Sequence, residues 1–175
     1  MAYQIGETIL YGVEGVCTIV GTEHRTMAGM QLDYYVLQPV YNHQSKVLVP
    51  LQNSQLVAKM QPLLSEEEIR GLIRCMPAGQ DLHWEENDSL RREQFKEILL
   101  HGGRKEVVCL IKTLYLHQQE LAKRGKKLHM ADERFLKDAE KKLYEEFAYV
   151  LHIEREQVLP FILEQIREQE RNETE

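Results

Sequence analysis

Histidine and cysteine side chains have the widest range of chemistry in this chain, as metal ligands, nucleophiles and general bases. There are seven histidines and three cysteines, but no HExxH and no CxxC spacing. Cys109 and His117 lie eight residues apart on a stretch with the apolar spacing of a core helix. Gly12-Val-Glu-Gly15 joins two predicted strands, whereas a phosphate-binding loop joins a strand to a helix. We therefore expect no enzyme activity, no metal and no cofactor.

The cysteines and the apolar stretches also indicate where the protein works. Cys17, Cys75 and Cys109 are odd in number and form no close pair, so we expect reduced thiols and no disulfide framework. Val47–Leu51 and Val107–Ile111 are far shorter than the roughly 20 residues that cross a bilayer. The first residues have neither a basic region nor an apolar signal core. The expected location is the cytoplasm.

The single tryptophan, Trp84, stands in the polar stretch Asp81-Leu-His-Trp-Glu-Glu86. A lone tryptophan most often anchors a core, because large aromatic side chains are usually mostly buried. Its neighbours His83, Glu85 and Glu86 favour at least partial exposure instead. Two interpretations stay open here: a core anchor of the helical half, or a ring presented to a partner.

Basic residues gather in one part of the C-terminal half, although the formal net charge of the chain is −6. With that net charge the whole protein should not condense onto nucleic acid, so any DNA contact must be local. Interspersed acidic residues are typical of a solvated helix face, and the alternative is an edge that faces phosphates. The basic residues are Lys123, Arg124, Lys126, Lys127, Arg134, Lys137, Lys141 and Lys142, and the acidic ones are Asp132, Glu133, Asp138 and Glu140.

The N-terminal part predicts a small β-domain. Through about Leu64 the sequence is poor in charge, and apolar residues alternate with polar ones between glycine-containing turns. So short a β-rich unit hides its inner face by curling into an SH3-like or Tudor-like barrel. The predicted strands are Thr8–Tyr11, Val16–Val20, Tyr34–Gln38 and Lys46–Leu51, and a fifth near Gln55–Met60 would close the barrel.

The remainder predicts an all-helical domain of about five helices, so the fold class is α+β with two domains. Ser65-Glu-Glu-Glu68 predicts a helix start with a capping box, and Gly125 predicts a left-handed helix end. We expect a β-domain over 1–64, a helical domain over 65–167 and a charged, frayed tail over 168–175. The predicted helices run to about Met76, where Pro77-Ala78-Gly79 breaks the first, from Trp84 to Leu100, from after Gly103 to Arg124, through Phe135–Leu151, and onward from near Glu154.

The order of these parts resembles the CarD/CdnL family of bacterial transcription regulators. The resemblance rests on Tyr3-Gln-Ile-Gly-Glu-Thr-Ile-Leu-Tyr11, the turn at Gly15, Glu23-His-Arg-Thr26, Val47-Leu-Val-Pro50 and a helical half with one tryptophan. The β-domain is also similar to the polymerase-interacting domain of transcription-repair coupling factors, but no helicase motor follows here. The resemblance covers the chain to about Phe161.

The resemblance implies that the barrel binds the β subunit of RNA polymerase by adding its edge strand to a sheet there. Such β-addition turns unpaired backbone amides and carbonyls into affinity. Arg25 stands where the family has a polymerase-contacting arginine, whereas a second arginine of some relatives is replaced by Leu48. The implied polymerase-binding residues are Arg25, Thr26, Lys46, Val47, Leu48, Val49 and Pro50.

For the helical domain, the resemblance implies a contact with promoter DNA at the upstream edge of the transcription bubble. Trp84, at the start of a predicted helix, matches a tryptophan that wedges against the minor groove and prolongs the open complex. In relatives the following residues are often basic, whereas here they are Glu85, Glu86 and Asp88. The implied DNA-binding residues are Trp84, Arg91, Arg92, Lys123, Arg124, Lys126 and Lys127.

We therefore expect a monomeric regulator of initiation that is tethered to polymerase, and through it to the nucleoid, and depends only weakly on DNA sequence. The alternative is a protein–protein adaptor that binds polymerase or another partner and touches no DNA; the acidic residues after Trp84 favour it. An enzyme would require a cysteine and a histidine that only folding brings together.

Overall fold

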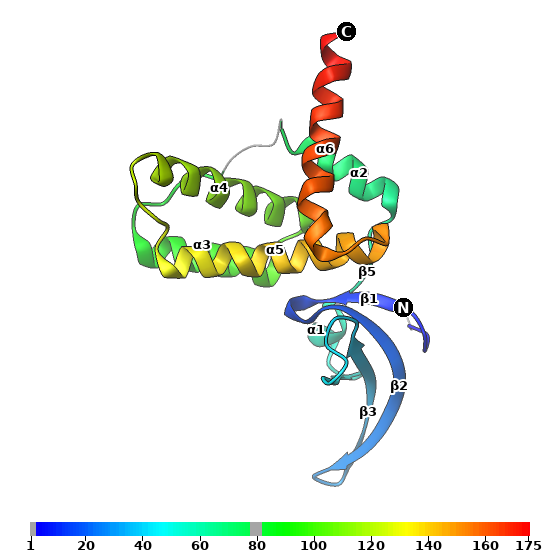
Figure 1. Cartoon of the computed structure of the whole chain (residues 1–175). Helices are drawn as coiled ribbons and strands as arrows, with labels where there is room; N and C mark the ends of the chain where they lie inside the picture. The colour runs from blue at the N-terminus through cyan, green and yellow to red at the C-terminus, as the bar shows by residue number, and fades with distance from the viewer. Residues whose placement is uncertain (1–2, 78–81) are drawn as a thin grey trace. The chain divides into compact units, whose positions relative to one another are not determined.

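The structure is a computed structural model that describes residues 3–77 and 82–175, and the chain divides into two compact units, Met1–Leu64 and Ser65–Glu175 (Figure 1). Ala78 and Gly79 of the predicted helix break lie outside the described residues. The described part confirms the predicted fold class, because a five-stranded antiparallel sheet is followed by five helices, α2 to α6.

The N-terminal unit is one antiparallel sheet in the order β4-β3-β2-β1-β5. Its inner face carries the core cluster, in which Cys17, Ile19, Leu37 and Val49 are fully buried. The strands are β1 (Thr8–Tyr11), β2 (Gly15–Met27), β3 (Met30–Pro39), β4 (Val47–Pro50) and β5 (Met60–Pro62), with a 3₁₀ turn η1 (Gly12–Glu14) after β1.

The four predicted strands are present, but β2 and β3 are much longer than expected. Their register shifts between Ile19 and Gly21, and a bulge of this kind bends a strand and increases its twist. The turn that joins them has positive φ at both central residues, Ala28 (52°) and Gly29 (78°), as a two-residue hairpin turn of matching twist requires. The result is a long, curved ribbon (Figure 1).

The predicted fifth strand near Gln55–Met60 is wrong in position. Asn53 accepts a hydrogen bond from the Leu56 amide at 3.1 Å and so starts a short helix, α1 (Ser54–Val57). The strand β5 follows only at Met60–Pro62 and pairs with β1. A local cap thus outweighs the strand propensity of this segment.

The C-terminal unit consists of α2 (Glu66–Cys75), α3 (Asp88–His101), α4 (Arg104–Lys123), α5 (Met130–Leu151) and α6 (Arg155–Thr174). Its core includes the fully buried side chains of Phe95, Leu110, Leu114 and Phe147. The capping box is confirmed, since the Ser65 hydroxyl accepts from the Glu68 amide at 3.1 Å and the Glu68 carboxylate accepts from the Ser65 amide at 2.7 Å. Gly125, with φ 69°, confirms the predicted left-handed end of α4.

Two predicted helix limits are wrong. The second helix begins at Asp88 rather than Trp84, because the Asn87 side chain accepts from the Leu90 amide and caps the helix there. At the other end of the unit, α6 continues to Thr174 where a frayed tail was predicted from residue 168. Gln169 helps to hold this last part, since its amide donates to Glu173 one turn on and to the Arg74 carbonyl of α2.

Candidate functional site

The outer part of the β2–β3 ribbon extends beyond the strands that flank it. β1 pairs with β2 only as far as Thr18, and β4 pairs with β3 only over Tyr34–Leu37. Arg25 lies in this outer part, opposite Leu32 on β3. Within the residues that the structure describes, no further strand pairs with the ribbon around Arg25, so its backbone edges face outward.

Arg25 lies on the face of the ribbon opposite to the core cluster. Leu32, its cross-strand partner, and Tyr34 are two residues apart and share this face, whereas Tyr35 and Leu37 face the core. The Arg25 guanidinium donates to Glu23 Oε2 at 3.0 and 3.1 Å, and its side chain is 53% exposed. An exposed pair of this kind holds its partners weakly, so Arg25 remains available to another carboxylate.

The strand β4 is one edge of the sheet, and its alternation decides which groups face outward. The Leu51 amide donates to the Asp33 carbonyl at 2.9 Å, which continues the β3–β4 ladder. In an antiparallel pair the bonding direction alternates, so Leu48 and Pro50 direct their backbone groups away from β3. Pro50 has no amide hydrogen, as is typical of a proline on a sheet edge. Within the described residues, the Leu48 amide and carbonyl therefore point outward from the sheet, in the direction from which a strand can be added.

Three of the predicted polymerase-binding side chains lie elsewhere than expected. Val49 is fully buried in the core cluster and Val47 packs against that cluster, because alternation turns both away from Leu48 and Pro50. Thr26 is exposed, but alternation puts it on the opposite face of the ribbon from Arg25. Lys46, directly before β4, is exposed. Arg25, Lys46, Leu48 and Pro50 therefore remain as candidates for contact through side chains or an outward edge.

The comparison with protein families concerns this same unit. Residues 3–64 match the model of the CarD-like/TRCF RID domain, where RID denotes the RNA polymerase-interacting domain. The N-terminal unit is similar to an RID domain over almost its whole length. The RID domain has a Tudor-like fold, in agreement with the barrel class predicted for this part of the chain. The match confirms the resemblance to the CarD/CdnL family over the N-terminal unit, and it supports an RNA polymerase-binding, transcription-related protein.

In the helical unit, Trp84 lies in an extended segment before α3 and is half-buried. Its ring stacks on the His117 imidazole of α4, with centroids 3.6 Å apart and planes 15° apart. It also meets Phe95 edge-on at 6.1 Å, and the Arg91 guanidinium carbon lies 4.7 Å from its centroid. Trp84 thus anchors to the core and keeps part of its surface exposed. Its presentation to a partner stays a prediction.

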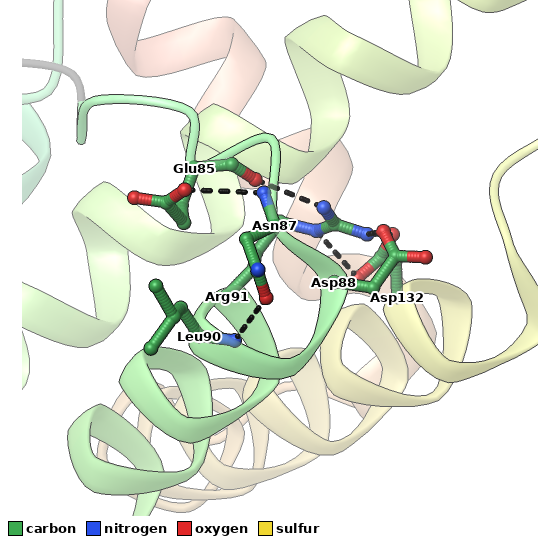
Figure 2. A network of polar contacts seen from close by, with 6 residues as sticks. All are labelled: Glu85, Asn87, Asp88, Leu90, Arg91 and Asp132. Carbon is green, nitrogen blue, oxygen red and sulfur yellow. Dashed lines mark hydrogen bonds and ion pairs between the residues drawn. The ribbon is translucent and has the colours of Figure 1, made fainter.

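Arg91 does not reach solvent, which corrects its predicted role as a phosphate contact. The residue is 2% exposed, and its guanidinium donates four hydrogen bonds (Figure 2). Two go to Asp132 at 3.2 and 3.0 Å, one to Asp88 at 2.7 Å and one to the Glu85 carbonyl at 2.9 Å. Its neighbour Arg92 is exposed and stays available.

Two ionisable groups near Trp84 are shifted. The hydrogen bond from Arg91 lowers the pKa of Asp88, which stays ionised. Burial lowers the pKa of His117, so the imidazole against Trp84 is neutral at physiological pH. The immediate surroundings of the indole are therefore less basic than a phosphate-binding site needs.

The predicted lysine corner lies at the end of α4 and in the connection to α5, next to this site. A hollow of about 730 Å³ is lined by Lys123, Lys126 and Lys127 with Gln118 and Gln119 of α4, directly after His117. Glu133, which follows Asp132 on α5, lines the other side. Arg124 is exposed and close enough to His117 to act on its pKa. Trp84, Arg124 and the three lysines therefore gather at one end of the helical unit.

Two further residues of the basic cluster are engaged in contacts of their own. Lys142 is half-buried and donates to the Leu99 carbonyl at 2.8 Å, so it holds the end of α3. Lys137 pairs with Glu133 one turn away at 3.5 Å. The residues that sequence reasoning missed are His117 and Asp132, because their partners lie 33 and 41 positions away along the chain. Their only sequence signal is a polar side chain on an otherwise apolar helix face.

In residues 3–77 and 82–175, no group of three or more histidine, cysteine, aspartate or glutamate side chains is arranged to hold a metal ion. Over the same ranges, no helix combines the length and the apolar character that a membrane span requires.

Proposed function

We propose that the protein regulates transcription initiation by binding the β subunit of RNA polymerase through its RID domain and stabilising the promoter open complex through its helical unit. Two observations carry the first part: the outward edge of β4, and the exposed Arg25 on the β2–β3 ribbon, both in a unit that matches the polymerase-interacting family. An added strand gains backbone hydrogen bonds at Leu48, and a carboxylate of the partner can pair with Arg25. Through polymerase the protein accompanies the nucleoid.

The DNA contact is supported by the residues that gather at one end of the helical unit. Exposed Lys123, Arg124, Lys126 and Lys127 offer charge to phosphates, and the free part of Trp84 offers an apolar surface to a distorted base step. Arg92 extends the basic residues onto α3. Because the chain is acidic overall, we expect this contact to matter only when polymerase holds the DNA nearby.

Polymerase binding is tested by replacing Arg25. We expect Arg25→Glu to abolish co-purification with the β subunit, because the substitution puts like charge against an acidic partner surface. Arg167→Glu is the matched control, since Arg167 is exposed on α6 in the other unit. Unchanged binding of Arg25→Glu would show that the ribbon is not the docking surface.

The DNA contact is tested at the promoter with polymerase present. We expect Trp84→Ala to shorten the lifetime of the open complex while polymerase binding stays intact. A combined Lys126→Ala/Lys127→Ala variant should shorten it in a salt-dependent way, since phosphate contacts release counterions. If the open complex keeps its full lifetime with Trp84→Ala at saturating bound protein, Trp84 does not act as a wedge against the DNA.

An adaptor that makes only protein contacts is the second candidate. It is favoured by the acidic surroundings of Trp84, where Glu86 and Asp132 act on the neutral His117. The cation that contacts the ring, Arg91, is buried. A footprint of the promoter complex with and without the protein separates the two. Protection near the upstream bubble edge supports the DNA contact, and an unchanged footprint supports the adaptor.

A further inference from the structure

The segment that carries Trp84 has no regular secondary structure of its own between Leu82 and Asn87. At one end the Leu82 amide donates to the Thr113 hydroxyl of α4 at 3.1 Å. At the other end Asn87 caps α3. Between these ends, the Glu85 carboxylate accepts from the Asn87 amide at 3.1 Å, which is a contact within the segment. A separate contact is needed to fix the middle of the segment against the helices.

That contact is the Arg91 guanidinium, seen in Figure 2 between the segment and two helices. Nη1 holds the Glu85 carbonyl, one residue after Trp84, at 2.9 Å. Nε and Nη2 hold the two carboxylate oxygens of Asp132 on α5, and Nη2 also holds Asp88 at the start of α3. One planar group therefore joins the segment, α3 and α5, in a geometry that the guanidinium fork provides and a lysine ammonium does not.

The same guanidinium also touches the ring that it helps to place. Its central carbon lies 4.7 Å from the Trp84 centroid, within the range of a cation–π contact. His117 stacks on the ring and Phe95 supports its edge, so the indole has little freedom to turn. Although burial alone would lower the pKa of Arg91, its hydrogen bonds to Asp132 and Asp88 raise it, so the cation persists at every physiological pH.

We propose that Arg91 is the positioning residue of Trp84: it binds no DNA itself but fixes the indole at the angle from which its exposed part meets the partner. Asp132 is the second member of this device, because it supplies two of the four hydrogen bonds to Arg91. Since Asp132 precedes Glu133 at the lysine hollow, the device also holds Trp84 at a fixed distance from the basic corner. The functional part of this inference rests on the proposed function.

The position of the ring can be measured directly, because Trp84 is the only tryptophan in the chain. We expect Arg91→Lys to shift the emission maximum to the red and to increase quenching by acrylamide towards the value of the urea-unfolded protein. Far-UV circular dichroism checks that the helices remain. Asp88→Ala is the milder second variant, since it removes only the partner that is half-exposed, and should give a smaller change of the same sign. Lys96→Gln, an exposed change on α3, is the matched control and should leave emission unchanged.

The functional readout is the lifetime of the open complex, measured as a double-mutant cycle. We expect Arg91→Lys to shorten the lifetime about as much as Trp84→Ala, and the double variant to be no shorter than Trp84→Ala alone, because both changes act through one ring. Unchanged emission and quenching in both Arg91→Lys and Asp88→Ala would overturn the positioning role. The positioning role would also be overturned if Arg91→Lys exposed the ring without shortening the lifetime of the open complex, while Trp84→Ala did shorten it.

Failure of the proposed function gives a different pattern. If Trp84→Ala itself leaves the lifetime unchanged, the DNA wedge is wrong, and the fluorescence of Arg91→Lys still decides whether Arg91 positions the ring.

Discussion

Arg25 and Arg91 make the difference between the two predicted binding regions clear. Arg25, on the β2–β3 ribbon, is half-exposed and pairs with one equally exposed glutamate two residues away. Arg91, beside Trp84, is buried and donates four hydrogen bonds, two of them to a carboxylate 41 positions away. The ribbon offers a partner its free backbone and a loosely held charge. In the helical unit, by contrast, Arg91 holds the Trp84 ring in place. The two regions should therefore respond very differently to substitution.

The largest expected effect is on stability in the helical unit. Asp132→Ala leaves the Arg91 charge buried without its main partner, and such a change typically costs about 3–5 kcal/mol of the free energy of unfolding. Urea denaturation of the full chain, followed by the fluorescence of Trp84, measures this loss. Glu133→Ala is the matched control, since the next residue makes only a surface pair with Lys137, and it should change stability by less than about 1 kcal/mol. Equal effects of the two changes would contradict the contrast.

The next effect is on binding by the RID domain. Leu48→Pro removes an outward amide from β4 and leaves the β3–β4 ladder intact, so we expect polymerase affinity to fall about tenfold, the equivalent of one hydrogen bond of about 1.4 kcal/mol. Titration against purified polymerase measures the affinity. Leu48→Ala keeps the amide and is the control. If Leu48→Ala weakens binding as much as Leu48→Pro, the contact is through the side chain and not through the strand edge.

The local parts of both regions could be predicted from the sequence, and the tertiary parts could not. The capping box of Ser65 with Glu68 and the left-handed helix end at Gly125 depend only on neighbouring residues. The structure confirms both predictions. Trp84 was assigned to a helix because it fits the apolar spacing, although the Asn87 cap was the stronger signal. Val47 and Val49 belong to the predicted partner surface only because the resemblance implies the whole segment, although strand alternation favours the inner face, where the structure has them. The Arg91–Asp132 pair joins two helices, and no spacing rule predicts it.

A smaller effect is the pH dependence that His117 gives the helical unit. Burial lowers its pKa in the folded protein, so the unfolded chain binds a proton first as the pH falls below about 6.5. Stability should therefore fall between that pH and the lower pKa of the folded state, and it gains nothing above pH 6.5. The groups that act on His117 are Asp132 and Glu86, which favour the charged form, and Arg91 and Arg124, which oppose it.

The measurement is the difference in stability between wild type and His117→Gln at pH 7 and at pH 5.5. The difference cancels the contributions of Glu140 and Glu145, whose pKa values burial raises and whose effect on stability has the opposite sign. We expect His117→Gln to lose part of the acid sensitivity, and His101→Gln, at an exposed histidine, to keep it. Identical slopes in wild type and His117→Gln would mean that folding does not lower the pKa of His117.

The smallest expected effect is at Glu23 on the ribbon. Glu23→Ala removes the one carboxylate that pairs with Arg25, and because both side chains are exposed, stability should change by less than about 0.5 kcal/mol. Polymerase affinity should stay the same or rise slightly, since Arg25 no longer has to leave an internal partner before it binds. Asp132→Ala and Glu23→Ala each delete a carboxylate that holds an arginine, yet the first should lower the free energy of unfolding by about 3–5 kcal/mol and the second by less than about 0.5 kcal/mol. A loss of affinity in Glu23→Ala would show that the glutamate orients Arg25 for binding, and the ribbon would then share the design of the helical unit.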